Sequence, residues 1–294
     1  MGKAYIGTTV VVGLVIMGTF FSKTKFVAKS IIYGTLVAGC ALYGVVISAV
    51  LRIFGKTRYA QYLVARAFYA CVSKTLGYKI NIKNSHYLDS NPAIYVLNHQ
   101  SALDVFVLGK LFQPGFTVTS KKSLKYIPFL GWFMLLSGTF FIDRSKGEKA
   151  KAVLNSALGN LKTTHSALVI FPEGTRAAKT ELELLPFKKG AFHLAKQAGI
   201  PIVPIVVSNT SPLFHAKTKV FESGTINIEV LKPVSTDDIK TNDDVTKLTE
   251  QVRSDMMDAY KRVGFSIPKN KPQPSPAPAP ASAESLDETT PLVG

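Results

Sequence analysis

The N-terminal part of the chain contains two long stretches without a charged side chain, residues 4–21 and 31–51. A helix that crosses the hydrocarbon core of a bilayer needs roughly 20 consecutive apolar residues. The second stretch meets this length and the first is marginal. A cleaved signal peptide is the alternative for the first stretch, but residues 19–21 (TFF) make a poor cleavage site. We therefore predict that residues 1–58 are a membrane segment with two helices, one in each stretch.

Basic residues flank the second stretch on both sides and leave its topology open. Lys23, Lys25 and Lys29 precede it, and Arg52 and Lys56 follow it. The positive-inside tendency favours a cytosolic location for everything downstream. Two spanning helices would place the lysines on the opposite side of the membrane. A hairpin that dips into one leaflet would keep all of these charges on the cytosolic face.

Residues 59–78 form a mostly apolar pattern that is interrupted by Arg66 and Lys74. Such a pattern is typical of an interfacial helix on anionic lipid. A core helix of the following domain is the alternative, and the sequence favours neither.

Residues 79–267 alternate between short apolar runs and helical patterns. The predicted strands are residues 93–97, 140–142, 167–171, 202–207 and 225–230, and the predicted helices are residues 101–112, 149–161, 191–198 and 245–263. Helices between apolar strands require crossover connections. We predict an α/β domain with a mixed, mostly parallel sheet flanked by helices. Residues 268–294, rich in Pro, Ala and Ser, are predicted to be a disordered tail.

The composition narrows the class of partner. The chain of 294 residues carries a formal net charge of +16, which calls for an anionic partner: a membrane surface, a phosphorylated substrate or nucleic acid. The lysines flank apolar runs and belong to no nucleic-acid-binding motif, so we expect no nucleic acid. Two cysteines in a chain of this length exclude a disulfide-stapled secreted domain.

A first motif, residues 98–104 (NHQSALD), directly follows the predicted strand 93–97. Open α/β sheets place their sites where strands end and helices begin. His99 and Asp104 are spaced so that their side chains meet across the bend. The carboxylate then holds one imidazole nitrogen and leaves the other as a general base. An ordinary loop–helix junction, with Ser101 and Asp104 as a capping box, is the alternative.

A second motif, residues 171–176 (FPEGTR), follows the predicted strand 167–171. Pro172 ends the strand, and Gly174 permits backbone angles or an approach that a Cβ forbids. Arg176 offers a planar fork of donors that matches a phosphate. An ordinary turn with a solvated Glu173 is the alternative.

Further basic residues surround apolar runs. Residues 138–144 (GTFFIDR) place Arg144 at the end of a strand, and Lys121 lies just before the apolar run 127–133. A surface salt bridge for Arg144 and a solvated face for the lysine are the alternatives.

In this order and spacing, the segments closely resemble the glycerolipid acyltransferase family, and within it the eukaryotic 1-acylglycerol-3-phosphate (lysophosphatidate) acyltransferases. The four blocks of the family are matched by Asn98-His99 with Asp104, by residues 138–144, by residues 171–176 and by Val203-Pro204-Ile205. The resemblance runs from about Tyr59 to Gly264 and does not include the tail.

This resemblance implies that an acyl group moves from acyl-CoA to a glycerol hydroxyl without a covalent acyl-enzyme. His99 takes the proton from the sn-2 hydroxyl, and Asp104 orients His99. Arg144 and Arg176 hold the phosphate of lysophosphatidate, while Glu173 and Gly174 shape the glycerol site. Thr175 and Lys121 complete the expected substrate-binding residues, with Asn98, Pro172 and Pro204 in support.

The resemblance also implies the setting of the reaction. A thioester is already activated, so we expect no metal and no cofactor, with acyl-CoA as co-substrate. The expected partners are lysophosphatidate, acyl-CoA and the membrane of the endoplasmic reticulum or a lipid droplet, and the sequence predicts no particular oligomeric state. Two alternatives remain: an acyltransferase for glycerol-3-phosphate or another lysophospholipid, and an inactive membrane protein that only binds lipid.

Overall fold

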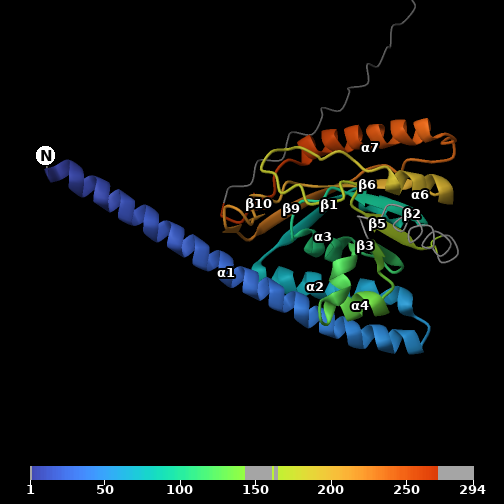
Figure 1. Ribbon diagram of the computed structural model, residues 1–294, viewed down its shortest axis with the longest axis horizontal. Coiled ribbons are helices and arrows are strands. Elements are labelled where there is room, and N and C mark those ends of the chain that lie inside the picture. Colours follow the sequence, from blue (N-terminus) through green and yellow to red (C-terminus); the bar gives the residue numbers. More distant parts are fainter. Residues whose placement is uncertain (1, 143–160, 162–164, 271–294) are drawn as a thin grey trace, which may run out of the picture.

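The computed structural model describes residues 2–142, 161 and 165–270, and its centre is a mixed sheet (Figure 1). The strands of this sheet are β1 (Lys79–Lys83), β2 (Ala93–Leu97), β3 (Phe116–Lys121), β4 (Phe140–Ile142), β5 (Ala167–Ile170), β6 (Ile202–Val207), β9 (Gly224–Val230) and β10 (Ile267–Pro268). Their order is β1-β9-β6-β2-β5-β3-β4, with β10 beside β9. β9 pairs antiparallel with β6 and β10, and the other pairs are parallel. The predicted mixed, mostly parallel sheet is confirmed.

Helices cover both faces of the sheet (Figure 1). The helices are α1 (Gly2–Ile53), α2 (Ala60–Leu76), α3 (Asp104–Leu111), α4 (Leu130–Leu136), α6 (Gly190–Ala198) and α7 (Asn242–Val263), with short 3-10 turns η1 (Thr57–Tyr59), η2 (Ser85–Asp89) and η3 (Lys122–Tyr126). Alternate residues of β2 point to opposite faces. Ile94 and Val96 pack with the α6–α7 layer, whereas Tyr95 and Leu97 pack with the layer that contains α2 and α3.

The two N-terminal apolar stretches lie in one helix, α1 (Figure 1), and the prediction of two helices with a connection between them is wrong. The segment 22–30 contains no Gly or Pro that would end a helix. Its lysines bind the domain instead of lining a loop: Lys25 Nζ lies 2.6 Å from a Glu222 carboxylate oxygen, and Lys29 Nζ donates to Ser223 Oγ over 3.3 Å. The part Lys23–Ile53 is long and apolar enough to cross a membrane.

α2 packs between α1 and α3 and has the burial of a core helix. Val64, Phe68, Val72 and Leu76, at helical spacing, are all buried. This packing matches the core-helix alternative for residues 59–78.

Several elements were not predicted from the sequence: β1, β3, β10, α4 and the small hairpin of β7 (Phe214–His215) and β8 (Val220–Phe221). Of the predicted helix 149–161, all residues but Leu161 lie outside the described residues, as does the tail from residue 271. Pro268, the first residue of the predicted tail, belongs to β10.

Candidate active site

The parallel strands bring both motifs to the same edge of the sheet. β2 and β5 are hydrogen-bonded neighbours, with Val96 opposite Ile170. The residues that follow these strands, 98–104 and 171–176, therefore lie side by side. β3 also ends at this edge with Lys121.

The loop after β2 is anchored to the end of β6 by buried amide side chains. Asn98 Nδ2 donates to Val207 O over 2.9 Å, and Val207 N donates back to Asn98 Oδ1 over 2.8 Å. Gln100 Nε2 donates to Val207 O and Ser208 O, and Gln100 Oε1 accepts from Thr210 N. This double anchor keeps the backbone of the intervening residue, His99, in place.

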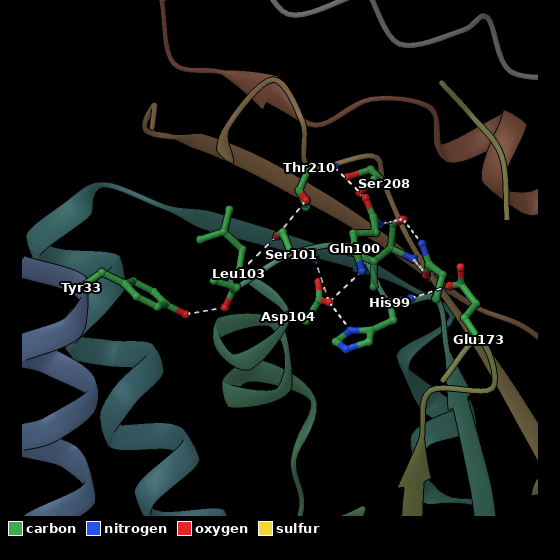
Figure 2. A network of polar contacts seen from close by, with 12 residues as sticks. Tyr33, His99, Gln100, Ser101, Leu103, Asp104, Glu173, Ser208 and Thr210 are labelled. Atoms are coloured by element: carbon green, nitrogen blue, oxygen red, sulfur yellow. Dashed lines mark hydrogen bonds and ion pairs between the residues drawn. The ribbon is translucent and has the colours of Figure 1, made fainter. Parts of the chain in front are cut away.

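His99 and Asp104 meet side chain to side chain, as their spacing predicts (Figure 2). The distance between His99 Nδ1 and Asp104 Oδ2 is 2.6 Å, and the two side chains are 13% and 6% exposed. Because Nδ1 donates to the carboxylate, the lone pair of the neutral ring is on Nε2. No described residue hydrogen-bonds Nε2, so this nitrogen is free to accept a proton.

Backbone donors hold the Asp104 carboxylate in position. Oδ2 accepts from Gln100 N over 2.8 Å and from Ser101 N over 3.1 Å. Ser101 Oγ bonds with Leu103 N and Thr210 Oγ1 rather than with Asp104 N. The predicted capping box is therefore only half formed, and the same carboxylate serves the loop and the imidazole.

The second motif supports His99 from the other side. The Phe171 ring stacks on the imidazole with 4.2 Å between ring centroids and 25° between planes. His99 O accepts a hydrogen bond from Ala177 N over 2.9 Å. The imidazole is thus fixed between its carboxylate partner and an aromatic face.

Glu173 lies at the backbone of His99, on the side away from the imidazole (Figure 2). It is not among the residues that line the cavity containing His99. Its Oε1 accepts from His99 N over 2.7 Å and its Oε2 from Leu185 N over 3.0 Å. The residue is only 3% exposed. Backbone donors of two loops engage both oxygens, so Glu173 joins these loops, and its predicted contact with substrate stays a prediction.

Burial raises the pKa of Glu173, and the backbone donors of His99 and Leu185 act in the opposite direction. A raised carboxylate pKa means that the folded state binds protons more tightly than the unfolded state. Its contribution to stability therefore falls as pH rises from the ordinary value of 4.5 through the raised pKa.

Glu173→Gln is expected to lower the free energy of unfolding by about 1–3 kcal/mol, because one backbone donor loses its acceptor. The deficit is expected to be largest near pH 4.5 and to narrow at higher pH, since only the wild type carries the titrating group. Unfolding curves in detergent at several pH values test this, with the exposed Glu250→Gln on α7 as control. A deficit that widens with pH would contradict the assignment.

Thr175 and Arg176 of the second motif lie on the side of the cavity, unlike Glu173. Gly174 has φ of +71°, and a Cβ there would come within 2.9 Å of Lys188 Nζ. The positive φ favours glycine at this turn, whereas the tip of the flexible Lys188 side chain could move aside. The turn places Thr175 and Arg176, both exposed, on the wall of the cavity that contains His99.

This cavity has a volume of about 610 Å³, within the range of about 300–1,000 Å³ typical of small-molecule sites. Its polar end holds His99, Thr175, Arg176 and Lys121. The apolar wall comes from α1 (Val37, Cys40 and Ala41), α2 (Val64 and Phe68) and α4 (Leu130, Phe133 and Met134). A ligand with an anionic head and a hydrocarbon chain matches both parts.

Sequence reasoning missed two polar residues beside this cavity. Tyr33 of α1 donates from its buried hydroxyl to Ala102 O over 2.8 Å, and so ties α1 to the loop of the first motif. Gln61 of α2 lines the cavity and donates to Thr117 Oγ1 and Ser137 O, each over 3.0 Å. Both lie in apolar helices, far in sequence from the motifs, and no local pattern marks them.

The other predicted site residues either do not line the cavity or lie outside the described residues. Pro172 is buried at the end of β5, and its carbonyl accepts from Lys188 N over 2.8 Å. Pro204 lies within β6 opposite Val96, away from the cavity. Arg144 lies outside the described residues, so its predicted phosphate contact stays a prediction.

Comparisons with known proteins identify relatives of this chain. A family model described as Acyltransferase matches residues 79–208. The 1-acyl-sn-glycerol-3-phosphate acyltransferase of Saccharomyces cerevisiae is 49% identical over 238 residues, which cover 81% of this chain and 78% of that protein. The human 1-acyl-sn-glycerol-3-phosphate acyltransferase alpha is 35% identical over 188 residues, 64% of this chain and 65% of that protein.

A solved structure shares the fold. The crystal structure of the 1-acyl-sn-glycerophosphate (LPA) acyltransferase PlsC from Thermotoga maritima aligns with a TM-score of 0.63 at 22% identity. The alignment covers 83% of this chain and 97% of that chain.

Proposed function

Because the chain belongs to the acyltransferase family that contains the 1-acyl-sn-glycerol-3-phosphate acyltransferases, we propose that it transfers a fatty acyl group from acyl-CoA to the sn-2 hydroxyl of lysophosphatidate. The products are phosphatidate and free CoA. The observation that carries this proposal is the His99–Asp104 pair, 2.6 Å apart, at the polar end of a cavity with a hydrocarbon-lined wall.

In the proposed reaction, His99 Nε2 accepts the proton of the sn-2 hydroxyl as its oxygen attacks the thioester carbonyl carbon. Asp104 holds the ring in the correct tautomer and stabilises the imidazolium that forms. The carbon–sulfur bond then breaks, and the leaving CoA thiolate takes the proton from His99. No acyl-enzyme forms, and the activated thioester requires neither metal nor cofactor. The remaining rate enhancement comes from holding both substrates in line.

The acceptor phosphate is assigned to Arg176 and Lys121, which share the polar end of the cavity with His99. Arg144, which lies outside the described residues, is proposed as a further phosphate-binding residue. A guanidinium fork matches a phosphate in geometry as well as charge. The acyl chain is assigned to the apolar wall between α1, α2 and α4.

Membrane attachment is part of this proposal. α1 carries the apolar segment Lys23–Ile53, and both the acceptor and the product are lipids. Each methylene kept out of water contributes about 0.8 kcal/mol, so a site at the bilayer avoids exposing whole acyl chains. We propose an integral protein of the endoplasmic reticulum or lipid droplets, with the domain on the cytosolic side.

The direct test is acyl transfer by the purified full-length protein in lipid nanodiscs. Labelled acyl-CoA is offered with lysophosphatidate, glycerol-3-phosphate or other lysophospholipids, and products are identified by mass spectrometry. Phosphatidate formed from lysophosphatidate is the expected result. A preference for glycerol-3-phosphate or another lysophospholipid would replace the acceptor, and absence of transfer to any acceptor would leave a lipid-binding protein.

Arg176→Ala is expected to raise the KM for lysophosphatidate by about 10- to 100-fold, the value of a lost charge-assisted hydrogen bond. The KM for acyl-CoA should change much less. Arg262→Ala on α7, outside the cavity, is the matched control. Equal increases in both KM values would show that Arg176 does not hold the acceptor phosphate.

A further inference from the structure

The segment of η3 and α4 exposes a run of large apolar side chains. We define the α4 face as Tyr126, Ile127, Phe129, Trp132 and Leu135. Their exposure ranges from 40% for Phe129 to 73% for Tyr126. Trp132 and Leu135 are three residues apart, so they share one side of α4. Contiguous exposed apolar side chains of this size mark an interaction surface rather than ordinary solvent-facing surface.

The α4 face adjoins the exposed apolar side of α1. α4 packs directly on α1, and the fit is close: a Cβ at Gly44 would lie 2.5 Å from the Phe133 ring. Near this contact, Tyr43, Val46 and Val50 of α1 are between 41% and 58% exposed. Both helices therefore expose large apolar side chains, and those of α1 belong to the candidate membrane span.

Among the described elements, α1, α2, η3 and α4 contain no acidic residue. No Asp or Glu occurs before Asp89, or between Asp104 and Asp143. Lys121 and Lys125, both exposed, border the α4 face. By contrast, α7 on the opposite side of the sheet carries several carboxylates, among them Asp243, Asp255 and Asp258 (Figure 1). An apolar surface bordered by exposed lysines is complementary to an anionic bilayer.

We propose that the α4 face, together with the adjoining side of α1, enters the headgroup–acyl boundary of an anionic bilayer, with Trp132 as an interfacial anchor. Trp and Tyr concentrate at this depth because their rings are amphipathic. The opposite side of α4, through Met134 and Phe133, lines the cavity of the active site. α4 then lies between the lipid and the cavity, and an acyl chain would pass from the bilayer into the cavity beside this helix. This last consequence rests on the proposed function; the lipid contact itself does not.

Trp132 makes the proposal directly measurable, because it is the one tryptophan in the chain. The full-length protein is reconstituted in vesicles of phosphatidylcholine and phosphatidylserine, with or without lipids brominated near the headgroup end of their chains. We expect the bromines to quench Trp132 emission strongly. We also expect the emission maximum in vesicles to lie at shorter wavelength than that of an indole in water. Unquenched emission that a water-soluble quencher reduces would overturn the proposal and would fit a protein partner instead.

A relocated tryptophan is the control for quenching. Trp132→Phe combined with Glu250→Trp puts the one indole on the exposed side of α7, where we expect no quenching by brominated lipid. Equal quenching of both proteins would mean that the signal does not report the α4 face, and would overturn the assignment. In vesicles of pure phosphatidylcholine we expect weaker quenching of Trp132, because the exposed lysines then have no anionic lipid to bind. Equal quenching in both vesicle types would show that the contact does not require an anionic bilayer, and would overturn that part of the proposal.

Activity gives a second readout that separates this inference from the proposed function. The double variant Trp132→Lys/Leu135→Lys changes only exposed side chains outside the cavity. We expect a several-fold loss of turnover on bilayer-embedded lysophosphatidate and unchanged turnover on a short-chain, water-soluble lysophosphatidate. Unchanged turnover on both would overturn the lipid contact. A quenched Trp132 in a wild-type protein without transferase activity would overturn the proposed function alone.

Discussion

Replacing His99 with alanine is expected to lower acyl transfer by about 10²- to 10⁴-fold, the usual contribution of a general base. The cavity keeps its cations and its apolar wall in this variant, so the KM values for both substrates should change little. The residual rate then reports what substrate alignment contributes without proton transfer. Steady-state rates with labelled acyl-CoA and lysophosphatidate in nanodiscs measure the loss.

A matched control for this variant is His215→Ala, at a partly exposed position in the β7–β8 hairpin. It should retain wild-type turnover. A His99→Ala protein that remains folded and keeps more than about a tenth of the wild-type rate would be inconsistent with proton removal by the imidazole.

Asp104→Asn is expected to be nearly as damaging, with a loss in kcat of about 10²- to 10⁴-fold. The wild-type Oδ2 accepts from His99 Nδ1 and from the backbone N–H groups of Gln100 and Ser101. An asparagine oxygen that keeps the backbone donors cannot also stabilise an imidazolium. If its NH₂ group faces Nδ1 instead, the ring takes the opposite tautomer and Nε2 carries a proton.

The expected signature of Asp104→Asn is a lower kcat with little change in either KM, since Asp104 does not line the cavity. Asp89→Asn, at an exposed position in η2, is the control. A variant whose kcat is unchanged but whose KM for lysophosphatidate rises would show that the carboxylate shapes the acceptor site instead of orienting His99.

Local signals predicted the elements that form the site. Apolar runs such as 93–97 and 167–171 have the length and the bounding loop residues of buried strands, and both form as β2 and β5. Parallel pairing then brings the segments after these strands to one edge. The spacing of five between His99 and Asp104 is short enough that the contact needs only one bend of the chain. For these features, the chemistry is contained in neighbouring residues.

Contacts between distant segments could not be predicted in the same way. The sequence does not show that Glu173 turns toward His99 N and Leu185 N, because a carboxylate beside an exposed arginine suits a substrate contact equally well. Nor does it show that Lys25 pairs with Glu222, or that α1 continues through residues 22–30 where two separate helices were predicted. In both cases the partner lies far away along the chain, and only packing selects it.

The strands 93–97, 167–171 and 202–207, the two motifs and the apolar N-terminus are therefore properties of the sequence itself, since each depends on periodicity or spacing within a short window. The joining of α1, α2 and α4 into a cavity wall, and the exposure of the α4 face beside that wall, depend on tertiary packing. An apolar run such as 127–136 has the same local pattern whether its side chains face a core, a ligand or a lipid. Tertiary packing decides which of these environments each side chain of the run contacts.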